Sequence, residues 1–190
     1  MNRSNGSRKQ ILEAASAAFV EGDGHFEMAD VARRAGTSIG LAYHYFGSKT
    51  GLVSAVVSDF YDRFDAIVMA RMESDAPWRE RELRRFSIAV QFLFTDPLAP
   101  MIIGRLASGG EAAAVETDRR NRIIAAGARN IANAQKQGEV HPDIDPEIAS
   151  AVINGGLRHA AYMALTLAER PDAEEFARRA WFPIARGLCL

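Results

Sequence analysis

The sequence predicts an all-α protein in which a small N-terminal domain of three helices is fused to a larger helical domain. Apolar residues recur with helical spacing along nearly all of the 190 residues, and no stretch alternates as a half-buried strand would. Glycine and proline divide this pattern into about nine segments of helical length. The composition, 48% apolar and 25% charged residues, is that of a globular protein. We therefore expect a domain over residues 1–47 and a second over residues 48–190.

The first domain is expected to hold three short helices, because glycines end each apolar stripe. Gly22 follows the first stripe, and Gly36 suits the position just after the end of the second helix. Ser38 is a good N-cap for the third helix, which Gly47 then breaks. The expected ranges are about 5–21, 27–35 and 38–45.

The second domain is expected to hold six helices separated by proline and glycine. The fourth helix begins with Ser48 as its cap and ends before Pro77, and the seventh stops at Gly138. Pro183 is expected to kink or interrupt the ninth helix, because proline lacks the N–H that a helix interior requires. The remaining five expected ranges are about 78–95, 100–107, 111–137, 146–169 and 172–188.

Composition and motifs exclude several classes of protein. Cys189 is the only cysteine, which excludes an internal disulfide and any metal site made of several cysteines. Spacings typical of serine hydrolases, zinc proteases and phosphate-binding loops are absent, so neither an enzyme nor a cofactor or metal is expected. No apolar run reaches the roughly 18 residues of a membrane span, and the polar first ten residues lack a signal-peptide core. We therefore expect a cytoplasmic protein that does not bind membranes.

Charge restricts how the chain could bind a nucleic acid. The net charge is −1, from 23 basic and 24 acidic residues, so binding would depend on a local basic surface. Three cations and no acid lie in the first ten residues, at Arg3, Arg8 and Lys9. This arm suits a phosphate-binding end of the molecule, and an ordinary solvated terminus is the alternative.

The most informative segment lies between residues 27 and 49. Two short helices joined by the tetrapeptide Ala-Gly-Thr-Ser at residues 35–38 are typical of a helix-turn-helix. Tyr43, His44 and Tyr45 follow on the second of these helices, and rings about 100° apart cannot all be buried. An exposed tyrosine hydroxyl, a lysine and helix N-terminal amides are groups that fix proteins to phosphates. An ordinary helical hairpin remains the alternative at this point.

The joint spacing in this segment resembles the DNA-binding domain of TetR-type transcriptional regulators. An A-G-x-S turn, a Y-x-x-F helix end and an S-K-x-x-L helix start follow one another between Ala35 and Leu52. The resemblance implies phosphate contacts from Tyr43 and Lys49, with the residues at the start of the third helix and His44 facing the major groove or its backbone. The complete implied DNA-binding set is Thr37, Ser38, Ile39, Gly40, Leu41, Tyr43, His44 and Lys49.

Two features depart from the family's pattern. Glu27 stands where the family usually has a threonine that caps the second helix and touches a phosphate, and a carboxylate there would repel DNA. Ile39 and Leu41 occupy positions often filled by basic or hydroxyl side chains. Contacts with thymine methyl groups, His44 and DNA shape are therefore expected to contribute more of the specificity.

The resemblance also implies a homodimer and a ligand pocket in the second domain. A two-fold dimer would place two recognition helices about 34–36 Å apart on a near-palindromic operator. Small residues of the eighth helix and an aromatic residue of the ninth are expected at the dimer interface: Gly155, Gly156, Ala160, Ala164 and Trp181. Aromatic and other apolar residues are expected to line a pocket for a small apolar or aromatic ligand: Phe60, Phe64, Phe86, Phe94, Met101, Ile102 and Met163. For both sets, ordinary packing within one subunit is the alternative.

The function that these observations favour is sequence-specific regulation of transcription. The resemblance implies a repressor that a small-molecule ligand releases from its operator. A second hypothesis is a helical protein that binds a small molecule and whose DNA binding is weak or lapsed, which Glu27 and the apolar recognition helix motivate. Salt-dependent binding to DNA upstream of its own gene would separate the two.

Overall fold

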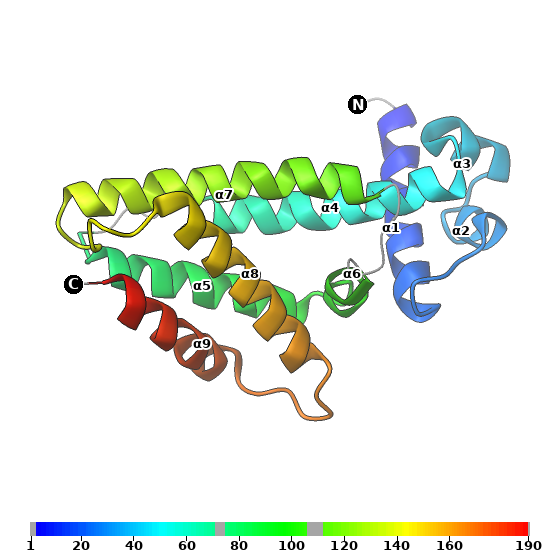
Figure 1. The fold of residues 1–190 in the computed structure, drawn as a ribbon. Coiled ribbons are helices and arrows are strands. Elements are labelled where there is room, and N and C mark those ends of the chain that lie inside the picture. Colours follow the sequence, from blue (N-terminus) through cyan, green and yellow to red (C-terminus); the bar gives the residue numbers. More distant parts are fainter. Residues whose placement is uncertain (1–2, 71–74, 106–111, 190) are drawn as a thin grey trace. The chain divides into compact units, whose positions relative to one another are not determined.

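The chain is all-α, as the sequence predicts. The computed structural model describes residues 3–70, 75–105 and 112–189, except for the side chains of residues 3–5, 104–105 and 112–116. These residues form nine helices (Figure 1): α1 (Arg3–Glu21), α2 (Met28–Arg34), α3 (Ile39–Phe46), α4 (Lys49–Val68), α5 (Trp78–Thr95), α6 (Ala99–Arg105), α7 (Ala112–Lys136), α8 (Pro146–Leu165) and α9 (Ala173–Leu188). Within the described ranges, none of them combines the length and apolarity needed to cross a membrane.

Two helices differ from the predicted ones. The helix α8 ends at Leu165, four residues earlier than expected, and the Thr166 hydroxyl donates a hydrogen bond to the carbonyl of Met163 over 2.8 Å. The helix α9 continues through Pro183, so of the two expected effects the interruption is wrong and the kink stays a prediction. Pro183 and Arg179, whose carbonyl loses its i+4 donor, are both exposed, so water can replace the missing N–H.

The chain forms two compact units. Unit 1 comprises residues 1–63 and 97–113, and unit 2 comprises residues 64–96 and 114–190. The division falls within α4 and assigns α6 to unit 1, whereas the sequence predicts a boundary after residue 47. The part of α4 in unit 1 carries apolar side chains, among them Leu52 and Val56, that are fully buried.

Unit 1 has a small core formed mainly by α1, α2, α3 and the start of α4. Ile11, Val31, Leu52 and Val56 are fully buried, which contributes roughly 1.5–3 kcal/mol for each side chain. This core holds α2 and α3, which have 7 and 8 residues and would be marginal on their own.

Unit 2 is built around the packing of α5 against α9, with α8 beside them (Figure 1). The Trp181 ring lies between two aromatic rings of α5, with centroids 5.9 Å from Trp78 and 5.8 Å from Phe86. The loop after α7 turns at Gly138, whose φ of +73° suits glycine. The amide of Gln135 holds this loop by donating hydrogen bonds to the carbonyls of His141 (2.9 Å) and Ile144 (2.8 Å).

Candidate functional site

The turn between α2 and α3 is fixed by its own hydrogen bonds. Gly36 adopts a φ of +64°, a conformation that side-chain-bearing residues resist. The Thr37 N–H donates to the carbonyl of Ala32 over 3.0 Å, and the Ser38 hydroxyl accepts a hydrogen bond from the Leu41 N–H over 3.2 Å. The structure therefore has the tight helix-turn-helix that the sequence predicts, and the N-cap of α3 is the predicted serine.

One face of α3 is exposed on unit 1. Ile39 and Tyr43 are one turn apart and are 44% and 45% exposed, respectively. Gly40 and His44, also one turn apart, are exposed beside them. Ala42 is fully buried and anchors the opposite face. An exposed face with a fixed buried anchor is what insertion into a groove requires.

The other predicted DNA-binding residues surround this face. A Cβ atom at Gly40 would meet only the Ser38 hydroxyl, at 4.0 Å, so the backbone there is open to close approach. Thr37 and Leu41 are half-buried, and Ser38 is exposed. The Ser38 hydroxyl accepts the cap hydrogen bond with its oxygen, so its hydrogen remains able to donate to a phosphate.

Lys49, the predicted phosphate contact at the start of α4, is not isolated. Its Nζ lies 3.0 Å from Oε1 of Glu27 and 5.8 Å from the centre of the Phe26 ring. The Glu27 carboxylate, at the start of α2, therefore forms an ion pair with Lys49. Sequence reasoning singled out both residues and missed their contact, because 22 positions separate them.

The basic N-terminal arm is partly described. The Arg8 guanidinium lies 5.2 Å from the centre of the half-buried Phe46 ring, and Lys9 pairs with Glu13 at 3.5 Å. The side chain of Arg3 lies outside the described residues. Arg8 is thus held against the C-terminal end of α3 by a cation–π contact, which places one cation of the arm beside the candidate surface.

Unit 2 contains a cavity of about 340 Å³. Its apolar wall includes Phe86, Leu157 and Trp181, and its polar side includes Arg85 and Asn130. The complete lining is Val68, Met69, Ala70, Arg81, Glu82, Arg85, Phe86, Ala89, Ile123, Ala126, Gly127, Asn130, Ile153, Asn154, Leu157 and Trp181. The cavity is large enough for a small organic ligand.

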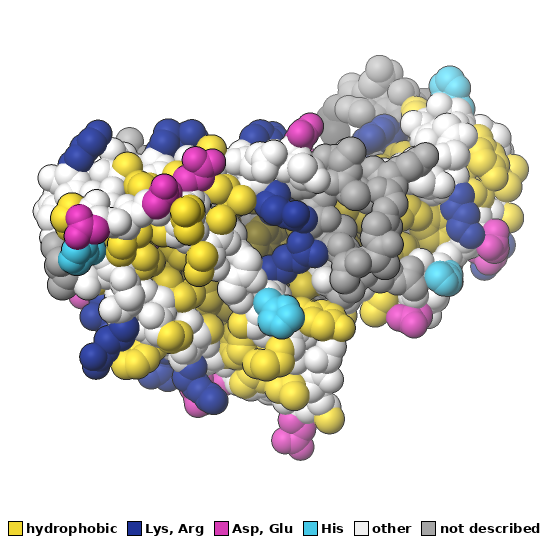
Figure 2. All heavy atoms as spheres, in the orientation of Figure 1, with side chains coloured by type: hydrophobic (Ala, Val, Ile, Leu, Met, Phe, Trp, Pro, Cys, Tyr) yellow, Lys and Arg dark blue, Asp and Glu magenta, His cyan; other side chains and the backbone are white. Residues whose placement is uncertain are grey.

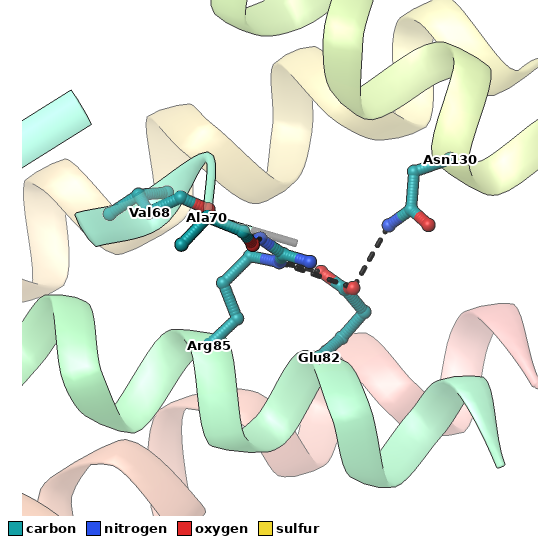
Figure 3. A network of polar contacts seen from close by, with 5 residues as sticks. All are labelled: Val68, Ala70, Glu82, Arg85 and Asn130. Carbon is teal, nitrogen blue, oxygen red and sulfur yellow. Dashed lines mark hydrogen bonds and ion pairs between the residues drawn. The ribbon is translucent and has the colours of Figure 1, made fainter. Parts of the chain in front are cut away.

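The polar side of the cavity is an ordered network, shown in Figure 3. The Nε of Arg85 donates to the Glu82 carboxylate, and its Nη1 donates to the carbonyls of Val68 and Ala70 at the end of α4. The Asn130 amide donates to Oε1 of Glu82 over 2.9 Å. Arginine and glutamate are therefore held in one arrangement by helices α4, α5 and α7.

Of the predicted pocket residues, only Phe86 lines this cavity. Phe60, Met101 and Ile102 belong to unit 1, and Met163 is 54% exposed. Phe64 and Phe94 are in unit 2, where their rings contact those of Phe92 and Phe176, and neither residue lines the cavity. The ligand-binding role of the other six residues stays a prediction, and the charged residues of this cavity are not among the predicted pocket residues.

The predicted interface residues separate into two groups. Gly155 and Gly156 are exposed on α8, and a Cβ atom added to either would meet no atom within 4 Å. Ala160 is half-buried. Ala164 and Trp181 are buried at 0% and 3% exposure, so their side chains lie in the core of unit 2 and not on its surface.

The glycine face of α8 also carries large apolar side chains that are not among the predicted interface residues. Ile148 and Val152 are 65% and 63% exposed, and Met163 follows on the same helix. Figure 2 shows hydrophobic side chains gathered along α8. Phe182 adds an exposed ring on α9. Exposed apolar side chains grouped on one helix are typical of a protein–protein interface.

Comparison with known proteins gives relatives for the N-terminal part. Residues 11–56 match the sequence profile described as "Bacterial regulatory proteins, tetR family". The HTH-type transcriptional regulator BetI of Rhizobium meliloti (strain 1021) is 32% identical over 119 residues, which are 62% of this chain and 57% of that protein. BetI of Escherichia coli O45:K1 (strain S88 / ExPEC) is 36% identical over 78 residues, 40% of each chain. The matches span about half the length of these curated relatives.

Solved structures share the fold of the whole chain. SmeT, the repressor of the Stenotrophomonas maltophilia multidrug efflux pump SmeDEF, has a TM-score of 0.79 over 96% of this chain and 90% of that one, at 18% identity. NalD, the secondary repressor of the MexAB-OprM multidrug efflux pump in Pseudomonas aeruginosa, has a TM-score of 0.75 over 98% of each chain, at 22% identity. The profile match therefore covers the helix-turn-helix segment, and the solved structures share the fold of the whole chain.

Proposed function

We propose that the protein is a homodimeric, sequence-specific DNA-binding regulator of transcription, a repressor that a small molecule releases from its operator. The observation that carries the proposal is the exposed face of α3, which lies within the segment that matches the tetR profile. The family is one of regulators, which argues against an enzyme. Binding to bacterial chromosomal DNA implies action in the cytoplasm.

DNA recognition is proposed to combine phosphate anchors with a largely apolar reading face. Tyr43 and Lys49 contact the phosphate backbone, and the exposed Ile39 side chain meets thymine methyl groups in the major groove. His44 supplies the hydrogen-bonding group on the same face. Ser38 and Thr37 contact the backbone at the N-terminal end of α3.

A Lys49→Ala variant is expected to weaken binding to all DNA sequences alike, because a phosphate contact carries no sequence information. The log–log salt slope of the binding constant should fall in magnitude by about one unit for each subunit. Tyr43→Phe should cost roughly 0.5–3 kcal/mol through loss of a charge-assisted hydrogen bond. The measurement is an anisotropy titration on the DNA upstream of the gene and on a scrambled duplex at several salt concentrations. An unchanged slope with wild-type affinity would remove Lys49 from the DNA contacts.

Dimerisation is proposed through the exposed face of α8 together with α9. The two glycines at positions 155 and 156 permit close approach of a second helix, and Ile148 and Val152 supply apolar area that is 65% and 63% exposed in one subunit. Symmetric pairing of this face would give the two-fold axis that a near-palindromic operator requires. Sedimentation that finds only monomers at micromolar concentration, with and without DNA, would contradict it.

The cavity of unit 2 is proposed as the site of the releasing ligand, a small molecule with an aromatic or apolar body. Phe86 and Trp181 provide the aromatic wall, and the network around Arg85 and Glu82 provides hydrogen-bonding groups on one side. Ligand binding would favour a conformation of the dimer that no longer fits its operator. The ligand lies wholly within unit 2 in this proposal.

Filling the cavity is expected to abolish ligand binding without unfolding the protein. Ala126 lines the cavity and is half-buried, whereas its neighbour Ala125 is exposed and does not line it. Ala126→Leu should reduce the fluorescence of bound 1-anilinonaphthalene-8-sulfonate severalfold, and Ala125→Leu should leave it unchanged. The matched control removes any effect of helix propensity, since both changes introduce the same residue into α7. Equal fluorescence in the two variants would show that the dye does not bind in this cavity, and would contradict the proposal that the ligand does.

The second candidate function is a ligand-binding protein with weak or lapsed DNA binding. The contact that favours it is the ion pair between Glu27 and Lys49, which occupies a predicted phosphate-binding group. This alternative is supported if the protein binds no DNA duplex at low salt, where phosphate contacts are strongest.

A further inference from the structure

The cations on unit 1 are largely neutralised by neighbouring carboxylates. Six Lys or Arg side chains are described between residues 6 and 63, and five of them form ion pairs within the unit. These pairs are Lys9–Glu13 (3.5 Å), Arg33–Asp30 (3.4 Å), Arg34–Glu21 (2.7 Å), Lys49–Glu27 (3.0 Å) and Arg63–Asp59 (3.1 Å). The sixth, Arg8, stacks on Phe46.

The Lys49–Glu27 pair differs from most of the others. Three of the five pairs join residues three or four positions apart on one helix, where such contacts are common. The Lys49–Glu27 pair instead joins the start of α4 to the residue before α2, 22 positions away. Lys49 is a predicted phosphate contact, both from the resemblance to TetR-type regulators and from its position near α3.

The charge of Glu27 complements the dipole of α2, but this effect does not require a contact with Lys49. Glu27 is the N-cap residue of α2, yet its side chain makes no capping hydrogen bond. Its side chain is 76% exposed, so it contributes little to the core of unit 1. The one polar contact described for the Glu27 carboxylate is the ion pair with Lys49. The Lys49 side chain is 44% exposed and therefore accessible to a second anion.

We propose that the Glu27 carboxylate occupies Lys49 in place of a DNA phosphate, so that DNA binding requires exchange of one anion for the other. The inference rests on the proposed DNA-binding function and names a residue that lowers affinity. A carboxylate and a phosphate oxygen offer the same partner to an ammonium group. DNA binding therefore replaces the existing Lys49–Glu27 ion pair with a Lys49–phosphate contact. The contribution of Lys49 to the binding free energy is reduced by the free energy of the ion pair that is broken.

A double-mutant cycle separates this exchange from simple repulsion between Glu27 and DNA. Repulsion acts whether or not residue 49 is a lysine, so it predicts the same effect of Glu27→Gln in both backgrounds. Exchange predicts a larger effect when Lys49 is present, because only then does the substitution free a cation. Glutamine keeps the shape of the side chain and removes only the charge.

The probe is a labelled duplex of about 30 base pairs of arbitrary sequence, since phosphate contacts do not depend on sequence. Anisotropy titrations at about 50 mM salt keep these contacts measurable. Glu27→Gln should tighten binding by about two- to fivefold for each subunit in the Lys49 background, as expected for release of an exposed ion pair. In the Lys49→Ala background the gain should be at most half of that.

The control is Asp59→Asn, which removes the same charge from an ion pair on α4. Asp59 lies about 15 Å along the helix from residue 49. This distance exceeds the Debye length at about 50 mM salt, so salt screens the charge of Asp59 from a phosphate bound at residue 49. This variant should leave affinity within experimental error of the wild type. Circular dichroism and thermal unfolding of each variant establish that unit 1 remains folded.

The outcomes distinguish the inference from the function on which it rests. A larger gain in the Lys49 background supports the exchange. Equal gains in both backgrounds, or no gain in either, overturn it while leaving DNA binding intact. Failure of the wild type and of Glu27→Gln to bind any duplex overturns the proposed function, and the exchange with it.

Discussion

A Gly156→Leu variant is expected to dissociate into folded monomers. In one subunit the added side chain meets open space, because a Cβ atom at this position has no neighbour within 4 Å. Replacement of a glycine inside a helix should also stabilise α8 by up to about 1 kcal/mol. In the proposed dimer, however, each subunit would insert a leucine between two closely packed helices. Overpacking of this kind costs about 1–3 kcal/mol for each copy, or roughly 2–6 kcal/mol for the symmetric pair.

The dissociation constant should therefore rise by about 30-fold to 10⁴-fold while monomer stability is unchanged or increased. Sedimentation velocity over a range of concentrations measures the first quantity, and urea unfolding of the dilute protein measures the second. Gly6→Leu is the matched control, because Gly6 is an exposed glycine of α1 that also faces open space. A Gly156→Leu protein that remains dimeric with wild-type affinity would show that this face of α8 is not the interface.

A Trp181→Ala variant is expected to destabilise unit 2 by about 3–5 kcal/mol, the typical effect of removing a large buried aromatic side chain. Trp181 is 3% exposed and packs against Trp78 and Phe86, so its removal leaves a void in the middle of the α5–α9 contact. Trp181→Phe should cost much less. It keeps most of the ring and removes an indole N–H that has no hydrogen-bond partner among the described residues.

The protein's two tryptophans both lie in this core, so their fluorescence reports the unfolding of unit 2. Urea unfolding at one fixed protein concentration compares the variants, because dimerisation makes stability dependent on concentration. If Trp181→Ala unfolds at the same urea concentration as the wild type but no longer dimerises, Trp181 belongs to the dimer interface, as the sequence predicts.

Local signals in the sequence were sufficient for the helices and for the recognition turn. Gly36 requires a positive φ, Ser38 caps α3 and Gly138 ends α7, and each of these effects acts within a few residues. Periodicity then locates the buried stripe of each helix. Pro183 is the exception, since its exposed position allows the helix to continue where local rules predict a kink or an interruption.

Contacts between distant residues could not be predicted in the same way. The arginine and glutamate of the cavity at positions 85 and 82 look like solvent-exposed charges on α5. Their burial depends on backbone carbonyls at the end of α4 and on the amide of Asn130, 48 residues from Glu82. Similarly, nothing in the spacing indicates that Glu27 reaches Lys49.

The helix α8 shows a further limit of sequence patterns. Small residues occur on both of its faces, and a pattern of small residues does not distinguish packing within a subunit from packing between subunits. Ala161 and Ala164 face the core, whereas Gly155 and Gly156 face outward. The choice depends on the direction from which α5 and α9 approach, which is a property of the complete fold.

In the proposed DNA-binding function, the pairing of Lys49 with Glu27 also affects how the protein searches for its operator. A bacterial chromosome offers on the order of 10⁶–10⁷ competing sites, and each is held by the same unselective phosphate contacts. Because Glu27 already occupies Lys49, the proposed exchange would shorten the residence time on those sites. It also slows the first encounter, because electrostatic steering weakens. In the proposed function, Glu27 would therefore shorten visits to wrong sequences and leave more of the protein free to reoccupy its operator when the ligand is withdrawn.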